Sequence, residues 1–526
     1  MNAKSLLMAT IAIALLLSIT PLGCAQEKTL NIALGEEPDN LNPIGNANIY
    51  DCIKVFSGLL KSDEDLEMAP DLAESWEVSE DGKSYTFHLK KGVKWQDGSD
   101  FTADDVKFTY DLLRNQDWTA VFPTSSEYEV IDDVQIIDDS TVKFTLSEGI
   151  VPFQERFTLP ILPKHLLDGE DLSKTEFWQA PIGTGPYELV EWTKGEELVM
   201  AANPDYYGDA PIIQRIKFVF VPDENARVSL LKSGEVDAIK IDARTKSILE
   251  GAPGIKVVTA PSANWYGLSL PNDKLPFSIK EVRQAIAYAI NKQQILDTVF
   301  YGQGEVAYGP YREADWVYNP DIAYSYDPEK AKQLLADAGF RDSDGDGILE
   351  KDGIKLEFDL VYGSSNAERK DIAIAAKTDL AEVGVGVNPV GKSWNEIDYD
   401  VFHSEAFTVA WGSPFDPDDL NYKLWNSEYI DQGWWNPATY NNPEVDELLN
   451  EGRTTWDDDK RKEIYGNVQE ILVEDQPVVF LVFGDYIYAL SDKVSGTKPR
   501  NGPHGYGSNG ALTGELWWNV EEWDKE

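Results

Sequence analysis

The clearest hydrophobic pattern in the chain lies between residues 71 and 113 and predicts three consecutive elements. Apolar and polar residues alternate through Tyr85–Leu89, a period of two that predicts a strand with one buried face. Asp81-Gly82 precedes this strand and predicts the tight turn of a hairpin. Thr102 is followed three residues later by Asp105, the spacing of a capping box at the start of a helix. The segment therefore predicts a compact β-β-α unit.

Two later segments show the order strand, helix, strand, which implies a parallel pair of strands in each. The first runs from 212 to 238, with Pro222-Asp223 at the start of its helix. The second runs from 359 to 390. Ser278 and Glu281 have the spacing of a further capping box. Helices and strands therefore alternate along much of the chain, as in an α/β protein.

Length and composition place the chain among large globular proteins. Its 526 residues are enough for two or three domains, and 42% hydrophobic with 26% charged residues is ordinary for such a protein. The 16 Trp, 24 Tyr and 20 Phe are unusually many. Aromatic side chains suit a core, and they also suit a cleft that binds organic ligands through contact area and stacking.

The strongly acidic composition excludes one class of partner. With 92 acidic and 46 basic residues, the formal net charge is −46. Nucleic acid is not an expected partner, because a phosphate backbone requires a basic stripe. The charge favours solubility over attraction of cationic solutes. The histidines lack the spacing of metal ligands, so neither a zinc or nickel site made of protein ligands nor a cofactor is expected. They are His88, His165, His403 and His504.

The first residues have the features of a secretory signal. Residues 1–23 hold an apolar run over 6–19, which is too short for a membrane span and suits a signal peptide. Cys24 follows Gly23, which resembles the cleavage box of a lipoprotein, although Pro21 stands where Leu is usual. We expect Cys24 to become the lipid-carrying N-terminus and to anchor the protein to a membrane. Secretion with a free Cys24 and an uncleaved anchor are the alternatives.

The segment Leu72–Tyr110, LAESWEVSEDGKSYTFHLKKGVKWQDGSDFTADDVKFTY, resembles the signature segment of the extracytoplasmic solute-binding proteins of family 5. These are the peptide- and nickel-binding components of ATP-binding-cassette (ABC) importers. Two further segments are similar to the family, Ile182–Tyr187 (IGTGPY) and Asn203–Ala238. The resemblance covers nearly all of the mature chain.

The resemblance implies an α/β fold with two lobes, of the periplasmic-binding-protein type (type II, similar to cluster C), and an extra small domain inserted in the first lobe. It places the crossings between the lobes near residues 262 and 484. The expected divisions are a signal peptide over 1–23, the first lobe over 24–60, 177–262 and 484–526, the inserted domain over 61–176 and the second lobe over 263–483.

The implied function is capture of a solute outside the cytoplasmic membrane, at the cell surface or in the periplasm. A monomeric lipoprotein binds a short peptide in the cleft between its lobes and delivers it to the permease subunits of an ABC importer. A nickel chelate or another metal chelate is the alternative solute. Neither solute requires an enzyme or a cofactor.

A secreted glycoside hydrolase or carbohydrate-binding protein is the alternative from another class, because carboxylates among tryptophans also describe a glycosidase site. The excess of acidic residues makes such pairs common by chance, however. The chain also has no nucleophile elbow, HExxH motif or phosphate-binding loop. We therefore expect a binding protein rather than an enzyme.

The best candidate for ligand chemistry is the loop from Trp411 to Asp419, which holds Asp416 and Asp418. A cationic amine in a dry cleft requires a carboxylate partner. In the peptide binders that the chain resembles, an Asp three residues after the matching tryptophan binds the α-amine of the ligand. Pro414 occupies that position here, so either Asp416 takes the role or the amine is bound differently. A solvated acidic turn is the alternative.

Other candidates share an aromatic or hydrogen-bonding side chain near the expected cleft. Together the aromatic ones indicate an aromatic wall, although each alone is more often a core residue. Arg312 has the fork of donors that binds a ligand carboxylate, with an ordinary surface arginine as the alternative. The remaining candidates are Asn264, Trp265, Tyr266, Trp394, Trp434 and Glu36.

A second acidic segment begins like a calcium-binding loop. Asp342, Asp344 and Asp346 stand at its first, third and fifth positions, and glycine is at the sixth. Gly353 occupies the twelfth position, where such a loop has a glutamate that binds through both oxygens. We therefore favour a turn and keep calcium as the alternative.

Overall fold

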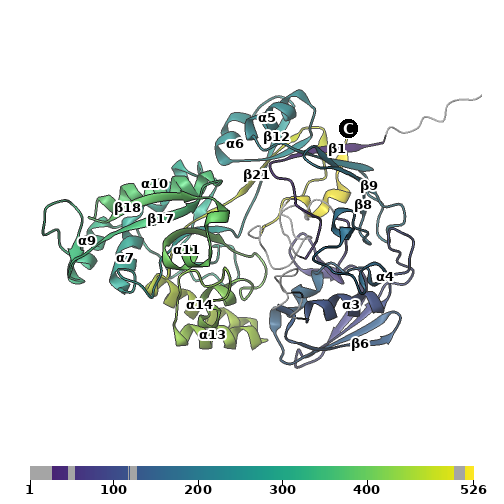
Figure 1. The fold of residues 1–526 in the computed structure, drawn as a ribbon, viewed down its shortest axis with the longest axis horizontal. Coiled ribbons are helices and arrows are strands. Elements are labelled where there is room, and N and C mark those ends of the chain that lie inside the picture. Colours follow the sequence, from purple (N-terminus) through teal and green to yellow (C-terminus); the bar gives the residue numbers. More distant parts are fainter. Residues whose placement is uncertain (1–26, 45–53, 116–117, 119–126, 503–515) are drawn as a thin grey trace, which may run out of the picture.

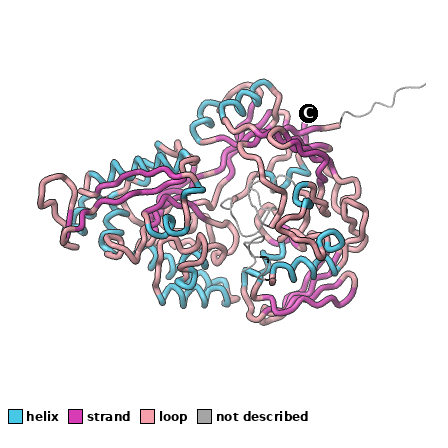
Figure 2. The backbone as a smooth tube through the Cα atoms, in the orientation of Figure 1, coloured by secondary structure: helices cyan, strands magenta, loops and turns pink. Residues whose placement is uncertain are grey.

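The described part of the molecule is built on two large sheets and a smaller four-stranded sheet, with helices around them and three further two-stranded sheets (Figure 2). We call the part built on the seven-stranded sheet lobe 1, the part built on the six-stranded sheet lobe 2, and the part built on the smaller sheet the four-stranded unit. The predicted signal peptide over 1–23 and the predicted lipid site at Cys24 lie outside the described residues. The computed structural model (Figure 1) describes residues 27–44, 54–115, 118, 127–502 and 516–526.

Lobe 1 is built on a sheet with the strand order β12-β21-β11-β1-β10-β9-β8. β1 lies between β10 and β11 and is parallel to both. The strands predicted within 212–238 are therefore parallel but not neighbours, because an N-terminal strand lies between them. Their connection, α5 (Glu224–Ser233), starts after Asp223 as predicted. The strands are β1 (Thr29–Leu34), β8 (Tyr187–Thr193), β9 (Glu197–Ala202), β10 (Arg215–Phe220), β11 (Ala238–Ile241), β12 (Ile255–Ala260) and β21 (Tyr486–Ser491).

Lobe 2 is built on a sheet with the order β14-β20-β13-β19-β17-β18. β17 and β18 are parallel neighbours joined by α10 (Ala367–Ala381), which confirms the unit predicted over 359–390. Every residue of β20 is buried. The strands are β13 (Trp265–Ser269), β14 (Gly304–Val306), β17 (Glu357–Gly363), β18 (Gly386–Lys392), β19 (Ala406–Trp411) and β20 (Val478–Gly484), with helices that include α7 (Lys280–Ala289), α8 (Lys292–Thr298), α9 (Pro328–Asp337), α13 (Pro443–Thr454) and α14 (Asp458–Asp475).

The capping box predicted from Ser278 and Glu281 is wrong. Helix α7 begins at Lys280, and its N-cap is Ile279, which has no side-chain acceptor for the free N–H groups. Ser278 lies one position too early, because its own N–H donates to Lys274 O at 2.7 Å in the preceding turn. The turn that precedes α7 therefore places Ser278 outside the N-cap position, in spite of its spacing from Glu281.

The four-stranded unit has the order β4-β5-β7-β6 and contains the predicted hairpin of β4 and β5. Gly82 has φ +66° in its turn. Thr102 N–H donates to Asp105 Oδ2 at 3.0 Å, which confirms the predicted capping box of α3 (Ala103–Leu113). Tyr85 and Phe87 are buried, as their alternation predicts. The other elements are β4 (Ala73–Val78), β5 (Ser84–Leu89), β6 (Ile131–Asp138), β7 (Thr141–Leu146) and the 3-10 helix η3 (Val151–Thr158).

The four-stranded unit shares its hydrophobic core with lobe 1. One cluster of buried apolar side chains extends through both, while a second, smaller cluster lies within lobe 1 and those of lobe 2 form clusters of their own. The boundaries of an inserted domain at 61 and 176 stay a prediction.

The chain passes between the two large sheets twice. It leaves lobe 1 between β12 and β13 and returns between β20 and β21. We call residues 261–264 the first crossing and Asp485 the second crossing. Both adjoin the end of the molecule where β12, β21 and α6 (Ala243–Leu249) lie (Figure 1).

Lys292 is a charged group placed in the core of lobe 2. It is the first residue of α8 and is 5% exposed. Its Nζ donates to Ala307 O at 3.2 Å and lies 5.2 Å from the ring centroid of Tyr308. Burial lowers the pKa of Lys292 to about 7.

Replacing Lys292 by Met should stabilise the fold in a pH-dependent way. The folded pKa lies below the ordinary lysine value of 10.5, so the cost of burying this amine is complete below pH 7 and fades as pH rises toward 10.5. Urea unfolding of both proteins should therefore give Lys292→Met the larger free energy of unfolding, with an advantage that shrinks between neutral and alkaline pH. Lys370→Met, on the exposed face of α10, is the control. A constant advantage across this range would contradict the prediction.

Candidate functional site

The predicted ligand loop follows β19, a central strand of lobe 2, where Trp411 is paired with Trp265 of β13. Gly412 begins the loop with φ +144°. A Cβ atom at Gly412 would lie 1.8 Å from Ala263 O, so only glycine allows the loop to approach the first crossing this closely. The loop is thereby fixed beside the segment that joins the lobes.

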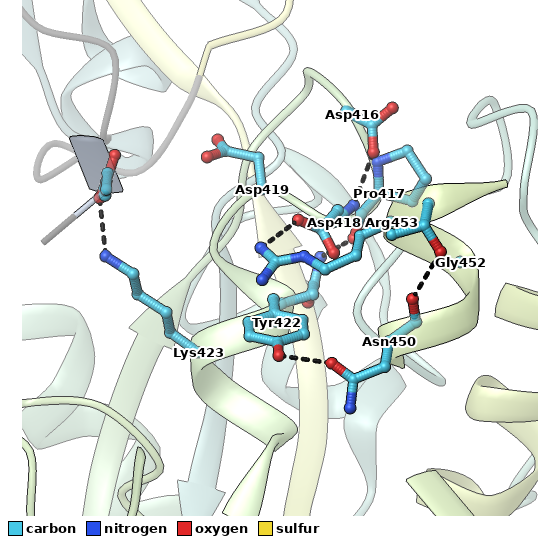
Figure 3. Close-up of polar contacts among 12 residues, drawn as sticks. Asp416, Pro417, Asp418, Asp419, Tyr422, Lys423, Asn450, Gly452 and Arg453 are labelled. Atoms are coloured by element: carbon cyan, nitrogen blue, oxygen red, sulfur yellow. Dashed lines mark hydrogen bonds and ion pairs between the residues drawn. The ribbon is translucent and has the colours of Figure 1, made fainter. Parts of the chain in front are cut away.

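Each acidic side chain of this loop is bonded to an arginine. Figure 3 shows one of these pairs, Arg453 with Asp418. Arg461 donates to both carboxylate oxygens of Asp416, at 2.6 and 2.7 Å. Arg453 Nη2 donates to Asp418 Oδ2 at 2.9 Å. The third pair is Arg156 Nη2 with Asp419 Oδ1, at 2.9 Å. Asp418 and Asp419 are almost fully buried, so these pairs replace the water that a buried carboxylate loses.

These pairs give Asp416 and Asp418 structural roles that the sequence did not reveal. The arginines are distant in sequence from the acids, and in a chain with so many acidic residues no spacing identifies such partners. A solvated acidic turn, the alternative considered above, is wrong because the carboxylates are buried. A ligand amine at Asp416 stays a prediction and would have to share the carboxylate with Arg461.

The backbone of this loop is strained at Leu420. Its φ of +54° and ψ of −43° lie in a region that non-glycine residues rarely adopt. Asn421 N–H donates to Asp419 O at 2.5 Å across this residue, which closes a three-residue turn. Tyr311 Oη donates to Pro417 O at 2.9 Å on the preceding turn. The hydrogen bonds on both sides hold Leu420 in place.

The loop and the short helix that follows it, α12 (Asn421–Trp425), also contact the four-stranded unit. Lys423 Nζ lies 2.8 Å from Glu127 Oε1. Asp416 N–H donates to Glu155 Oε1 at 3.1 Å. Burial raises the pKa of Glu155 well above its ordinary value, and the nearby Asp416 and Asp419 raise it further. Glu155 therefore suits the site best in its neutral form.

Three of the predicted aromatic residues are joined through a cluster of rings in lobe 2. Phe402 has its ring centroid 5.8 Å from Trp411 and 4.8 Å from Trp434. Phe407 lies between Phe402 and Trp394 in the same cluster. Trp394 is 43% exposed and Trp434 47% exposed, so both present ring surface to solvent. They are suitable wall residues for an organic ligand.

Trp265 belongs to the core instead of a wall. It is 0% exposed, and its ring lies 4.9 Å from that of Phe480 and 6.1 Å from that of Trp425. The prediction that Trp265 lines the cleft is therefore wrong. The neighbouring Tyr266 is half-buried and contacts Phe300 at 5.0 Å between centroids.

Arg312 connects the two crossings. Its Nη1 donates to Ser262 O at 2.8 Å in the first crossing and to Asp485 Oδ1 at 3.1 Å in the second. Glu305 accepts from the same guanidinium at 3.3 Å. The guanidinium therefore holds the two crossings together. The predicted contact between Arg312 and a ligand carboxylate stays a prediction.

The last two candidates for ligand contact, Asn264 and Glu36, lie on different segments of the chain. Asn264 is buried in the first crossing, where its N–H donates to Ser262 Oγ at 2.9 Å. Glu36 is exposed on the loop after β1. Of these two, only Asn264 lies beside the loop that starts at Gly412.

The predicted calcium loop holds a small cluster of carboxylates. One ligand atom each from Asp342, Asp344 and Glu350 lies within 4.8 Å of the others. Lys355 already forms ion pairs with Asp344, at 3.1 Å, and with Asp346. A calcium ion there stays an alternative, and it would compete with this lysine.

Comparisons with known proteins agree on one family. The family model described as bacterial extracellular solute-binding proteins, family 5 Middle, matches residues 67–433. Protein XP55 of Streptomyces lividans is 33% identical over 90% of this chain and 87% of its own. The oligopeptide-binding protein AppA of Bacillus subtilis is 32% identical over 84% and 83%. The chain is similar in sequence to both relatives along most of its length, and AppA is named for binding oligopeptides.

Solved structures give the same result. NikZ of Campylobacter jejuni in complex with Ni(L-His) has a TM-score of 0.85 and 33% identity, covering 94% of this chain and 99% of its own. AppA of Bacillus subtilis in complex with a nonapeptide has a TM-score of 0.82 and 29% identity, covering 95% and 99%. These matches confirm the expected two-lobed α/β fold. No helix in the described ranges is long and apolar enough to cross a membrane.

Replacing Glu155 by Gln should stabilise the protein at neutral pH. The amide keeps an acceptor for Asp416 N–H and removes the charge. Because the folded pKa of Glu155 lies above the ordinary value of 4.5, this side chain contributes a loss of stability as pH rises past 4.5, and the variant lacks that contribution. The melting temperature of the variant should exceed that of the wild type at pH near 7 and approach it at pH near 4.5. Glu447→Gln, exposed on α13, is the control, and a deficit for Glu155→Gln at neutral pH would refute this prediction.

Proposed function

This chain belongs to the bacterial extracellular solute-binding proteins of family 5, and we propose that its solute is a short peptide, bound between the lobes and passed to a membrane permease. The family works outside the cytoplasmic membrane as the solute-binding part of ABC importers. The observation that carries the choice of a peptide is the similarity to AppA, whose structure holds a nonapeptide and matches 95% of this chain.

The lobe 2 surface supports a ligand held by contact area more than by charge. Trp394 and Trp434 expose ring surface, and burying such rings is worth about 1.5–3 kcal/mol each. The carboxylates of Asp416 and Asp418 are already bonded to arginines. A peptide can be held there through its backbone and apolar side chains, with its α-amine bound elsewhere.

A metal chelate is the second candidate. The similarity to NikZ, solved with Ni(L-His), favours it. A chelate supplies its own metal ligands, so the scarcity of histidine in this chain is compatible with it.

The proposal includes a lipid anchor at Cys24, a monomeric state and a place at the outer face of the cytoplasmic membrane. Its support is the sequence of the first 24 residues and the location of the family. An enzyme is not part of the proposal, because the family is described as solute-binding and the relative AppA is named as a binding protein.

Native mass spectrometry of the protein as purified tests the choice of solute. Calorimetry with a library of di- to nonapeptides and with nickel–histidine should then show heat for peptides. If only nickel–histidine binds, the proposed solute is a metal chelate and not a peptide. Release of products from oligosaccharides would overturn both.

Trp434→Ala should weaken peptide binding by about tenfold, because the ring surface available to the ligand is lost. The matched control is Tyr326→Ala, which removes another exposed ring of lobe 2 next to the start of α9. Isothermal calorimetry with the peptide identified above gives both affinities. Equal affinities for the two variants would show that Trp434 does not contact the peptide.

A further inference from the structure

Lobe 2 contacts the remainder of the molecule at a second place, away from the crossings. In Figure 1 the crossings adjoin β12 and α6, whereas α13 and α14 lie at the other end of lobe 2, facing the four-stranded unit. The contacts there join Glu127, Glu155 and Arg156 of the four-stranded unit to Asp416, Asp419 and Lys423 of lobe 2. We call these six residues the latch.

The latch is charged, complementary and shielded from solvent. Arg156 lies between Glu127, at 3.0 Å, and Asp419, at 2.9 Å. Lys423 reaches Glu127 from the other side, at 2.8 Å. The side chains of Glu127 and Asp419 are only 4% and 1% exposed, and those of Arg156 and Lys423 are 13% and 12% exposed. Positive and negative groups therefore alternate across a nearly dry boundary.

An aromatic contact extends this boundary. Trp456, between α13 and α14, lies over the hairpin turn of β4 and β5. A Cβ atom at Gly82 would lie 2.0 Å from Cζ2 of Trp456, so the ring rests directly on this glycine. Trp456 is otherwise 48% exposed.

The boundary can open without disrupting either core. The apolar clusters of lobe 2 are separate from the cluster shared by lobe 1 and the four-stranded unit. The groups of the latch are polar, and water can solvate them once the two sides part. A polar interface between independent cores is the kind across which parts of a protein move.

We propose that the latch holds the two lobes closed by itself, so that the closed form is populated without a solute and salt opens it. Closure brings Lys423 to Glu127 and Asp419 to Arg156, and their attraction lowers the free energy of the closed form relative to the open one. Ions in solution compete for the same groups once they are exposed. The latch acts on closure whatever the solute is.

The test uses the full chain freed of solute by unfolding and refolding. Small-angle X-ray scattering of Lys423→Glu should show a radius of gyration larger than that of the wild type by about 1 Å at low salt. High salt should expand the wild type toward the same value. Lys332→Glu makes the same change of charge on α9, 47% exposed and away from the latch, and should match the wild type.

Two further variants separate opening from misfolding. Lys423→Met and Trp456→Ala remove a contact without adding a charge, and each should expand the ligand-free protein while its circular dichroism stays that of the wild type. Identical radii at low salt for the wild type, both Lys423 variants and Trp456→Ala would overturn the proposal. Since no solute is present, this result is independent of the calorimetry that tests the proposed function.

Discussion

Pairing of buried carboxylates with arginines is the interaction on which the arrangement of lobe 2 depends. The loop after β19 carries Asp416, Asp418 and Asp419, and each is bonded to an arginine. Without these partners, buried carboxylates would each cost several kcal/mol of desolvation. The strained backbone at Leu420 lies in the same segment and is held by hydrogen bonds to the carbonyl oxygens of Asp419 and Pro417. A chain with a net charge of −46 thus uses some of its few bases to fold an acidic loop next to the crossing.

The location of this loop links ligand chemistry to the geometry of the lobes. Gly412 places its start against Ala263 in the first crossing, and the far end of the loop reaches the four-stranded unit. The exposed rings of Trp394 and Trp434 belong to the same lobe. The family assignment explains why the chain forms two lobes. The contacts of Gly412 and Asp419 show how residues of this chain hold those lobes next to each other.

Local patterns predicted most of the local structure, although the spacing of Ser278 and Glu281 gave a wrong capping box. The alternation through Tyr85–Leu89 and the spacing of Thr102 and Asp105 each specify one element, because neighbours in sequence determine it. Contacts between residues far apart in the sequence could not be predicted in this way. The insertion of β1 between β10 and β11, the burial of Trp265 and the pairing of Asp416 with Arg461 all depend on contacts between distant segments. The resemblance to a family provided the architecture, and it could not provide these pairs.

The bonds of Arg312 have a mechanical consequence. One guanidinium is bonded to Ser262 in the outgoing connection and to Asp485 in the returning one. The two connections cannot slide past each other without breaking these bonds, so shear between the lobes is resisted. Swinging about the axis through both connections leaves the bonds intact. These bonds therefore favour rotation of the lobes about the line through both connections over sliding.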